Sequence, residues 1–239
     1  MGRESFFMSN TLKVKEIFST VQGEGSKAGT PAVFIRLAGC NLWSGHESAR
    51  ESGKGACADW CDTYFYGGTP YPVVELVDAV QELTQGWSQR MVVISGGEPL
   101  LQMRRPIGAV LCTELKKIGV TLSVETNGTV SSPVLEFFDH ITLSPKPLKP
   151  IYMVDKAYPF AEWGHINIQS GTDLKVIVPT KWSDEAINEF ASWNFEHKFF
   201  QPKDIGDKGL GATEHAVRLA QRHEGWRVSF QTHKFAGLA

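Results

Sequence analysis

The stretch Met-Val-Val-Ile-Ser-Gly-Gly-Glu-Pro, residues 91–99, decides the fold class. It begins with an apolar run typical of a buried strand and ends in a polar turn with two glycines. Similar apolar runs lead into polar segments at 32–40, 121–129, 140–147, 198–204 and 227–234. Ligands of parallel βα sheets bind at the carboxyl ends of the strands. A single polar loop would be ordinary, but six together favour a binding site on one face.

Amphipathic patterns typical of helices fall between the apolar runs, at 74–83, 107–118, 182–193 and 213–223. Further strands are expected at 14–19 and 174–178. This alternation predicts an α/β fold in which parallel strands are joined by helical crossovers. The βα units are too few for an eightfold barrel, so we expect a partial, reduced βα barrel. We expect one domain over residues 1–239, with an inserted polar loop at about 41–56.

The composition is that of a soluble globular protein. Hydrophobic residues make up 42% and charged residues 21% of the chain, which excludes a disordered protein. The formal charge of -2 lacks the basic excess typical of nucleic-acid binding. We find neither a membrane-spanning apolar run nor a signal peptide. We therefore expect a cytoplasmic protein without nucleic-acid or membrane partners, and reduced cysteines.

Three of the four cysteines, Cys40, Cys57 and Cys61, lie within 22 residues, just after an expected strand. Cys112 falls in an expected helix and is predicted to be a small buried hydrophobe. The three clustered cysteines have three interpretations. They are scattered reduced thiols, a zinc site completed by His46, or the ligands of an iron–sulfur cluster with one open iron. The lack of an obvious fourth cysteine favours the open cluster.

The cysteine segments and the glycine-rich turn together resemble a radical S-adenosylmethionine enzyme. The motifs are Gly39-Cys40-Asn41-Leu42, CADWCDT at 57–63 and SGGEP at 95–99. That superfamily usually has CxxxCxxC, whereas this chain has Cx16Cx3C. The wide first gap is similar to the CX14CX2C variant of the 7-carboxy-7-deazaguanine synthase family. Segments at 18–25, 34–37, 125–128, 144–146, 201–204 and 231–234 also resemble that family, so the resemblance covers nearly the whole chain.

The resemblance implies a lyase of queuosine (7-deazapurine) biosynthesis. It would convert 6-carboxy-5,6,7,8-tetrahydropterin to 7-carboxy-7-deazaguanine with loss of ammonia. A 4Fe-4S cluster and S-adenosylmethionine would generate a 5′-deoxyadenosyl radical that abstracts the C6 hydrogen, and Mg²⁺ would assist. The resemblance also implies a homodimer and a flavodoxin- or ferredoxin-like electron donor. Two other interpretations stay open: a glycyl-radical activase-like enzyme, which would share the cluster motifs, and a zinc-binding interaction module.

The resemblance also implies residue roles. Cys40, Cys57 and Cys61 would hold the cluster, and Thr63 would bind Mg²⁺. The implied cofactor-binding residues are Trp60, Asp62, Gly96, Gly97, Glu98, Ser144, Pro145, Lys146, Gln201, Pro202, Lys203 and Asp204. The implied substrate-binding residues are Val21, Gln22, Gly23, Glu24, Arg36, Ser95, His233 and Ala239.

The chemistry of several residues suits these roles. Gln22, Glu24 and the free carboxylate of Ala239 could accept hydrogen bonds from a 2-aminopyrimidinone edge. Arg36 offers a forked donor for the substrate carboxylate, although it could instead form a surface salt bridge. Glu98 could accept from the cofactor ammonium or simply cap a helix.

Overall fold

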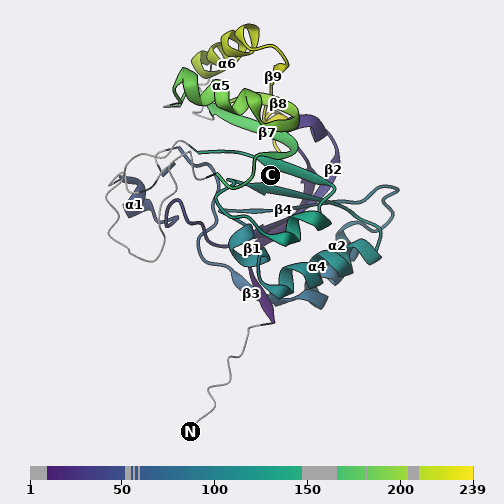
Figure 1. Cartoon of the computed structure of the whole chain (residues 1–239). Coiled ribbons are helices and arrows are strands. Elements are labelled where there is room, and N and C mark those ends of the chain that lie inside the picture. Colours follow the sequence, from purple (N-terminus) through teal and green to yellow (C-terminus); the bar gives the residue numbers. More distant parts are fainter. Residues whose placement is uncertain are drawn as a thin grey trace.

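The computed structural model describes residues 10–51, 55, 57, 58, 60–146, 166–180, 182–203 and 210–238. Within these residues, nine strands form one sheet in the order β3-β1-β2-β4-β5-β6-β7-β8-β9 (Figure 1). The strands are β1 Thr11–Val21, β2 Pro31–Leu37, β3 Thr69–Pro72, β4 Met91–Gly96, β5 Thr121–Thr126, β6 His140–Leu143, β7 Ser170–Val178, β8 Asn194–Pro202 and β9 Trp226–Val228. The helices are α1 Glu47–Glu51, α2 Val73–Leu83, α3 Leu100–Met103, α4 Pro106–Lys117, α5 Asp184–Ser192, α6 Leu210–Arg222 and α7 Thr232–Phe235, with 3-10 helices η1 Gly25–Lys27 and η2 Pro133–Phe137.

From β2 to β9 every neighbouring pair of strands is parallel. The sheet runs between two different edge strands, β3 and β9, and does not close on itself within the described residues. This confirms an α/β fold with a partial barrel rather than a complete one. Figure 1 shows α2 and α4 lying near β1 and β4, and α5 and α6 beside β7 to β9.

The N-terminal part of the sheet is antiparallel. Strand β1 pairs antiparallel with both β2 and β3. The segment of residues 22–30 between β1 and β2 is too short for a helical crossover, so the chain must reverse direction. Strand β3 was not predicted because its sequence, Thr-Pro-Tyr-Pro, has two prolines, which are tolerated only at a sheet edge.

The predicted helices are confirmed, and their local chemistry explains their positions. Helix α5 begins after Ser183, whose hydroxyl accepts from the Ala186 N–H at 3.2 Å. Helix α2 buries Leu76 and Val80 along its apolar face. Cys112 on α4 is fully buried in the main core, as expected for a small hydrophobe.

Two segments differ from the prediction. The apolar run at 227–230 predicts the last strand, but β9 covers Trp226–Val228 and the chain then forms the short helix α7. The segment 41–56 was expected to be irregular, yet it contains α1. No helix among the residues that the structure describes has the length and apolar character needed to span a membrane.

Candidate functional site

A cavity of about 350 Å³ lies at the carboxyl ends of the parallel strands. Each of the six polar segments predicted to converge contributes to its wall: Cys40 after β2, Ser95 in β4, Glu125 in β5, Ser144 after β6, Gln201 in β8 and His233 after β9. The convergence inferred from the order of apolar and polar segments is therefore confirmed.

Most of the residues predicted for the site line this one cavity. These are Val21, Gln22, Gly23, Glu24, Arg36, Cys40, Cys57, Trp60, Cys61, Asp62, Thr63, Ser95, Gly96, Gly97, Ser144, Lys146, Gln201, Pro202, Lys203 and His233. Glu98 and Pro145 do not contribute to the wall. Asp204 and Ala239 lie outside the described residues.

Three free cysteines lie on one wall of the cavity. Cys57 and Cys61 belong to one tight turn, in which the Cys61 N–H donates to the Cys57 carbonyl at 2.8 Å. Arg50 holds this turn in place, because its guanidinium donates to the Ala58 carbonyl at 2.6 Å and to the Cys61 carbonyl at 3.2 Å. The three cysteines also pack around a small apolar cluster that contains Leu42, Trp43 and Phe65.

The thiols differ in how readily they ionise. A hydrogen bond with Cys57 lowers the pKa of Cys61 to about 6. The same bond, together with burial, raises the pKa of Cys57 well above its usual value. Burial raises the pKa of Cys40 to about 12. Cys61 is therefore the thiol of this pair that ionises more readily, and a bound metal would displace the protons of the thiols that ligate it.

The donor set contains three free cysteines, the soft ligand type that an iron–sulfur cluster takes. Among the described residues, no group of three His, Cys, Asp or Glu side chains is arranged to hold one ion. A cluster spreads its thiolates over separate iron atoms, so its ligands need not converge on one point. His46, the fourth ligand considered for zinc, does not line the cavity and instead contacts the Tyr66 ring, with the two centroids 4.1 Å apart.

Two glycines let the cysteine segment pack directly against β4. A Cβ at Gly97 would lie 2.4 Å from the Gly39 carbonyl oxygen and 2.5 Å from the Cys40 Cβ. A Cβ at Gly96 would lie 2.2 Å from the Leu37 carbonyl oxygen, and Gly96 has a positive φ of 150°. The two glycines thus permit close approach to Leu37 at the end of β2 and to the Gly39–Cys40 segment that follows it.

Glu98 is almost completely buried just below the cavity wall. Its carboxylate accepts from the Leu100 N–H at 3.0 Å, the Asn127 N–H at 2.7 Å and the Thr126 hydroxyl at 2.9 Å. Burial raises the pKa of Glu98 to about 7. In this arrangement the carboxylate caps the start of α3 and joins it to the loop after β5.

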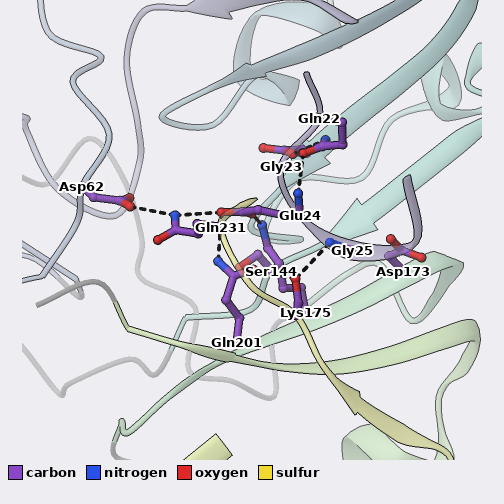
Figure 2. Close-up of polar contacts among 12 residues, drawn as sticks. Gln22, Gly23, Glu24, Gly25, Asp62, Ser144, Asp173, Lys175, Gln201 and Gln231 are labelled. Carbon is purple, nitrogen blue, oxygen red and sulfur yellow. Dashed lines mark hydrogen bonds and ion pairs between the residues drawn. The ribbon is translucent and has the colours of Figure 1, made fainter. Parts of the chain in front are cut away.

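Glu24 lies at the centre of a polar network that connects distant segments of the chain (Figure 2). Its carboxylate pairs with Lys175 of β7 and accepts from the side-chain amides of Gln201 at 2.9 Å and Gln231 at 2.8 Å. Gln231 also donates to Asp62 at 3.1 Å, beside the cysteines. The network therefore joins the expected substrate segment, the sheet, the cysteine loop and the C-terminal segment.

Gln22 occupies the next position in this polar wall. Its amide nitrogen donates to Glu125 at 2.9 Å, and its amide oxygen accepts from the Glu24 N–H at 3.0 Å. Burial raises the pKa of Glu125, which lines the cavity. A buried carboxyl and a fixed amide together can recognise a ligand that presents adjacent donors.

Helix α7 docks directly on the expected substrate segment. The Thr232 N–H donates to the Gly23 carbonyl at 2.9 Å, and Lys234 pairs with Asp62 at 2.7 Å. The His233 ring packs closely on Gly23, and a Cβ at position 23 would lie 1.8 Å from its Nδ1, so a larger residue there would displace the ring. His233 Nδ1 is buried and has no hydrogen-bond partner among the described residues.

The remaining wall carries cations and aromatic rings. Arg36 pairs with Glu16 through its Nε at 2.6 Å and lies 5.6 Å from the centroid of the Phe18 ring, which stacks on Phe34. The salt bridge considered as the alternative role of Arg36 is therefore present, but it uses only one of the five guanidinium donors, and the contact with the substrate carboxylate stays a prediction.

Two lysines that line the cavity lie near the Trp60 ring. The Nζ of Lys146 is 5.9 Å and that of Lys203 is 5.4 Å from its centroid. Lys146 also donates to the Ser144 hydroxyl at 2.7 Å. Thr63 lines the cavity two residues after Cys61.

Several cavity residues were not predicted individually, above all Lys175, Glu125 and Lys234. Asp173 and Lys175 lie two residues apart in strand β7, beside its apolar residues Leu174 and Val176, and both are buried. Charged residues inside an apolar strand are rarely buried without a partner. The presence of two charged residues beside the apolar run of this strand was the feature of the sequence that could have indicated Asp173 and Lys175.

The comparisons with known proteins agree with the site. The chain is 38% identical to the 7-carboxy-7-deazaguanine synthase of Burkholderia multivorans over 235 residues, which cover 95% of this chain and 99% of that protein. It is 39% identical to the synthase of Caulobacter vibrioides over 236 residues, with coverage of 95% and 99%.

A solved structure shows the same fold. The crystal structure of QueE from Escherichia coli matches with a TM-score of 0.65 and 24% identity, covering 93% of this chain and 95% of that one. No family model matches the chain. The identity to the curated relatives, sustained over nearly their full lengths, is decisive: the chain belongs to the 7-carboxy-7-deazaguanine synthase family of radical S-adenosylmethionine enzymes.

Proposed function

We propose that this chain contracts the ring of 6-carboxy-5,6,7,8-tetrahydropterin to give 7-carboxy-7-deazaguanine and ammonia. The observation that carries the proposal is the composition of one cavity. Three free cysteines lie on one wall, and a guanidinium with buried carboxyl and amide groups lies on the other walls. A radical reaction needs the redox centre and the substrate in one enclosed space, and this cavity supplies it.

Cys40, Cys57 and Cys61 would hold a 4Fe-4S cluster and leave one iron for the amino and carboxylate groups of S-adenosylmethionine. When bound, the reduced cluster and S-adenosylmethionine supply the radical chemistry that removes the C6 hydrogen of the substrate. The protein's part is to place the cofactor. The cofactor-facing side chains are proposed to be Trp60, Asp62, Ser144, Lys146, Gln201 and Lys203, with Gly96 and Gly97 allowing close backbone approach.

The substrate would bind on the opposite wall. The guanidinium of Arg36 retains donors beyond its Glu16 pair and can hold the substrate carboxylate as a forked ligand. Gln22 and the buried carboxyl of Glu125 can read the aminopyrimidinone edge. Glu24 is already bound by three protein groups, so it would act mainly by holding this wall in shape.

The docked helix α7 would exclude water from the bound substrate. Its contacts with Gly23 and Asp62 place Leu238 in the cavity wall, one residue before Ala239.

Four further points are proposed on the family resemblance. Mg²⁺ would bind at Thr63, whose hydroxyl suits a hard cation that keeps several waters. The enzyme would be a homodimer, receive its electron from a flavodoxin- or ferredoxin-like protein and work in the cytoplasm.

The test is anaerobic binding of the carboxypterin to protein reconstituted with iron and sulfide. We expect binding of 6-carboxy-5,6,7,8-tetrahydropterin and much weaker binding of tetrahydropterin without the carboxylate. A protein that holds the cluster but does not bind the carboxypterin would contradict the proposed substrate and favour a radical enzyme of another kind, such as a glycyl-radical activase.

A further inference from the structure

A second buried polar cluster lies deeper in the sheet, below the cavity. His140 of β6 and Asp173 of β7 are both almost fully buried, and the His140 Nε2 lies 3.4 Å from the Asp173 Oδ2. On its other side the His140 Nδ1 lies 3.1 Å from the hydroxyl of the buried Ser123. Neither His140, Asp173 nor Ser123 lines the cavity, so none of them has a place in the site described above.

This cluster binds the turn that follows the expected substrate segment. The Ser26 N–H donates to the Asp173 Oδ2 at 2.7 Å, and the Ser26 hydroxyl lies 3.1 Å from the His140 Nε2. Gly25 packs so closely on the carboxylate that a Cβ there would lie 2.3 Å from the Asp173 Oδ2. Gly25 also donates from its backbone N–H to the Ser229 hydroxyl at 2.9 Å.

The cluster and the cavity wall hold the same piece of chain at successive levels. Side chains two residues apart in a strand share one face of the sheet. On β7, Asp173 therefore faces the same way as Lys175, and they bind Ser26 and Glu24 respectively. On β5, Glu125 holds Gln22 while Ser123 supports His140. Segment 22–26 is thus bound by two layers of buried polar groups. Only the layer that contains Glu125 and Lys175 lines the cavity.

Burying charged groups costs free energy, which indicates that this cluster has a specific role. Although burial disfavours the charged form, hydrogen bonds from His140 and Ser26 lower the pKa of Asp173 below its usual range, so the carboxylate is ionised. Its Oδ1 is buried and has no hydrogen-bond partner among the described residues. Buried charged groups are often no more stabilising than apolar residues of the same size, but they can select one arrangement of the chain.

We propose that Asp173 and His140 are positioning residues for substrate binding: they fix the turn at 25–27, and so hold Gln22 and Glu24 in the geometry that the pterin requires. This inference rests on the proposed function for the identity of the ligand. It assigns no contact between the pair and the substrate, and it predicts that their loss affects the pterin and not S-adenosylmethionine.

The matched pair of variants is Asp173→Ala and Asp139→Ala. Each aspartate accepts a backbone N–H at 2.7 Å, from Ser26 and Leu122 respectively, but Asp139 pairs with Lys116 of α4 away from the cavity. Both variants would be reconstituted with the cluster. The measurements are hydrogen–deuterium exchange over 22–27 without ligand, and the anaerobic Kd values for the carboxypterin and S-adenosylmethionine.

We expect Asp173→Ala to raise the Kd of the carboxypterin at least tenfold, to leave the Kd of S-adenosylmethionine and the iron content within twofold, and to accelerate exchange over 22–27. Asp139→Ala should change none of these. Asp173→Asn should restore most of the affinity, because its amide oxygen can still accept from Ser26. If Asp173→Ala does not fold, the same measurements on His140→Gln, hydrogen–deuterium exchange over 22–27 and the two Kd values, test the inference.

Unchanged exchange over 22–27 and an unchanged Kd for the carboxypterin in Asp173→Ala or His140→Gln would overturn the inference. Equal weakening of both ligands would also overturn it, because it would indicate a general structural role. If the wild-type protein itself does not bind the carboxypterin, the proposed function fails, whereas the exchange measurement still tests whether the pair fixes the turn.

Discussion

Replacing Gly97 by alanine tests whether the glycine-rich turn shapes the cluster site. The added Cβ would lie 2.5 Å from the Cys40 Cβ, about 0.9 Å short of the 3.4 Å at which ordinary contact begins. It would also lie 2.4 Å from the Gly39 carbonyl oxygen, which already accepts from the Glu98 N–H at 3.0 Å. Backbone cannot rotate away as a flexible side chain can, so the Cys40 segment must move.

The size of this shift sets the expected result. Metal ligands tolerate displacements of about 0.2 Å, so a shift several times larger should prevent stable cluster binding. Overpacking of this kind typically costs about 1–3 kcal/mol of stability. The assay is iron and acid-labile sulfide per chain after anaerobic reconstitution, together with urea unfolding of the apoprotein.

Gly211→Ala is the matched control for this substitution. A Cβ at Gly211 meets no atom within 4 Å, and the residue lies in helix α6, where alanine is preferred. We expect Gly211→Ala to keep a full cluster and Gly97→Ala to lose most of it. A Gly97→Ala protein with the wild-type iron content and stability would refute the argument that close packing at position 97 positions Cys40.

Three further predictions concern separate parts of the molecule. Cys57→Ser should lose the cluster, whereas Cys112→Ser should keep it, by iron analysis and visible absorption; loss in the second variant would mean that the ligands are wrongly assigned. Arg36→Ala should raise the KM for the carboxypterin about ten- to hundred-fold, which corresponds to the usual free energy of a hydrogen bond to a charged group. Arg36→Lys should restore only part of the lost affinity, because lysine lacks the forked donor. An unchanged KM in Arg36→Ala would mean that Arg36 forms only a surface ion pair. Asp139→Ala should lower the free energy of unfolding by about 0.5–1 kcal/mol at pH 7, because Asp139 is half-exposed. Although partial burial opposes it, Lys116 lowers the pKa of Asp139, so this stabilisation is present above the unfolded-state pKa and is lost as the pH falls through the lower folded-state pKa. The difference in unfolding free energy between the wild-type protein and the variant, measured by urea unfolding, should therefore disappear below pH 3.8. A difference that persists there would exclude the charge of Asp139 as its cause.

The parallel part of the fold could be predicted because local pattern and global arrangement agree. Strand β4 is apolar on both faces, since a strand covered by helices on one side and by the interior on the other has no polar face. The convergence of the loops then followed from topology, because parallel strands direct their carboxyl ends to one edge. The apolar pattern alone does not show that β1 pairs antiparallel with β2 and β3, and the Thr-Pro-Tyr-Pro sequence of β3 is not typical of a strand.

The site was predictable in its residue types but not in its connections. Cys40, Cys57 and Cys61 carry a recognisable motif, and they line one cavity as expected. The role of Glu24 as the centre of a polar network could not be predicted from a motif, because its partners Lys175, Gln201 and Gln231 come from three segments far apart in the sequence. His140 and Asp173 lie in expected strands or beside them, yet a strand pattern does not show which buried polar groups face each other.

The central claim is that a radical reaction on a carboxypterin takes place in this cavity. Anaerobic turnover tests it most directly: the cluster-loaded protein is mixed with 6-carboxy-5,6,7,8-tetrahydropterin, S-adenosylmethionine, Mg²⁺ and a reductant, and the products are identified by mass spectrometry. We predict 7-carboxy-7-deazaguanine in many turnovers per chain, and none with Cys61→Ala. Unconverted pterin from a protein that carries a full cluster and cleaves S-adenosylmethionine would contradict the account.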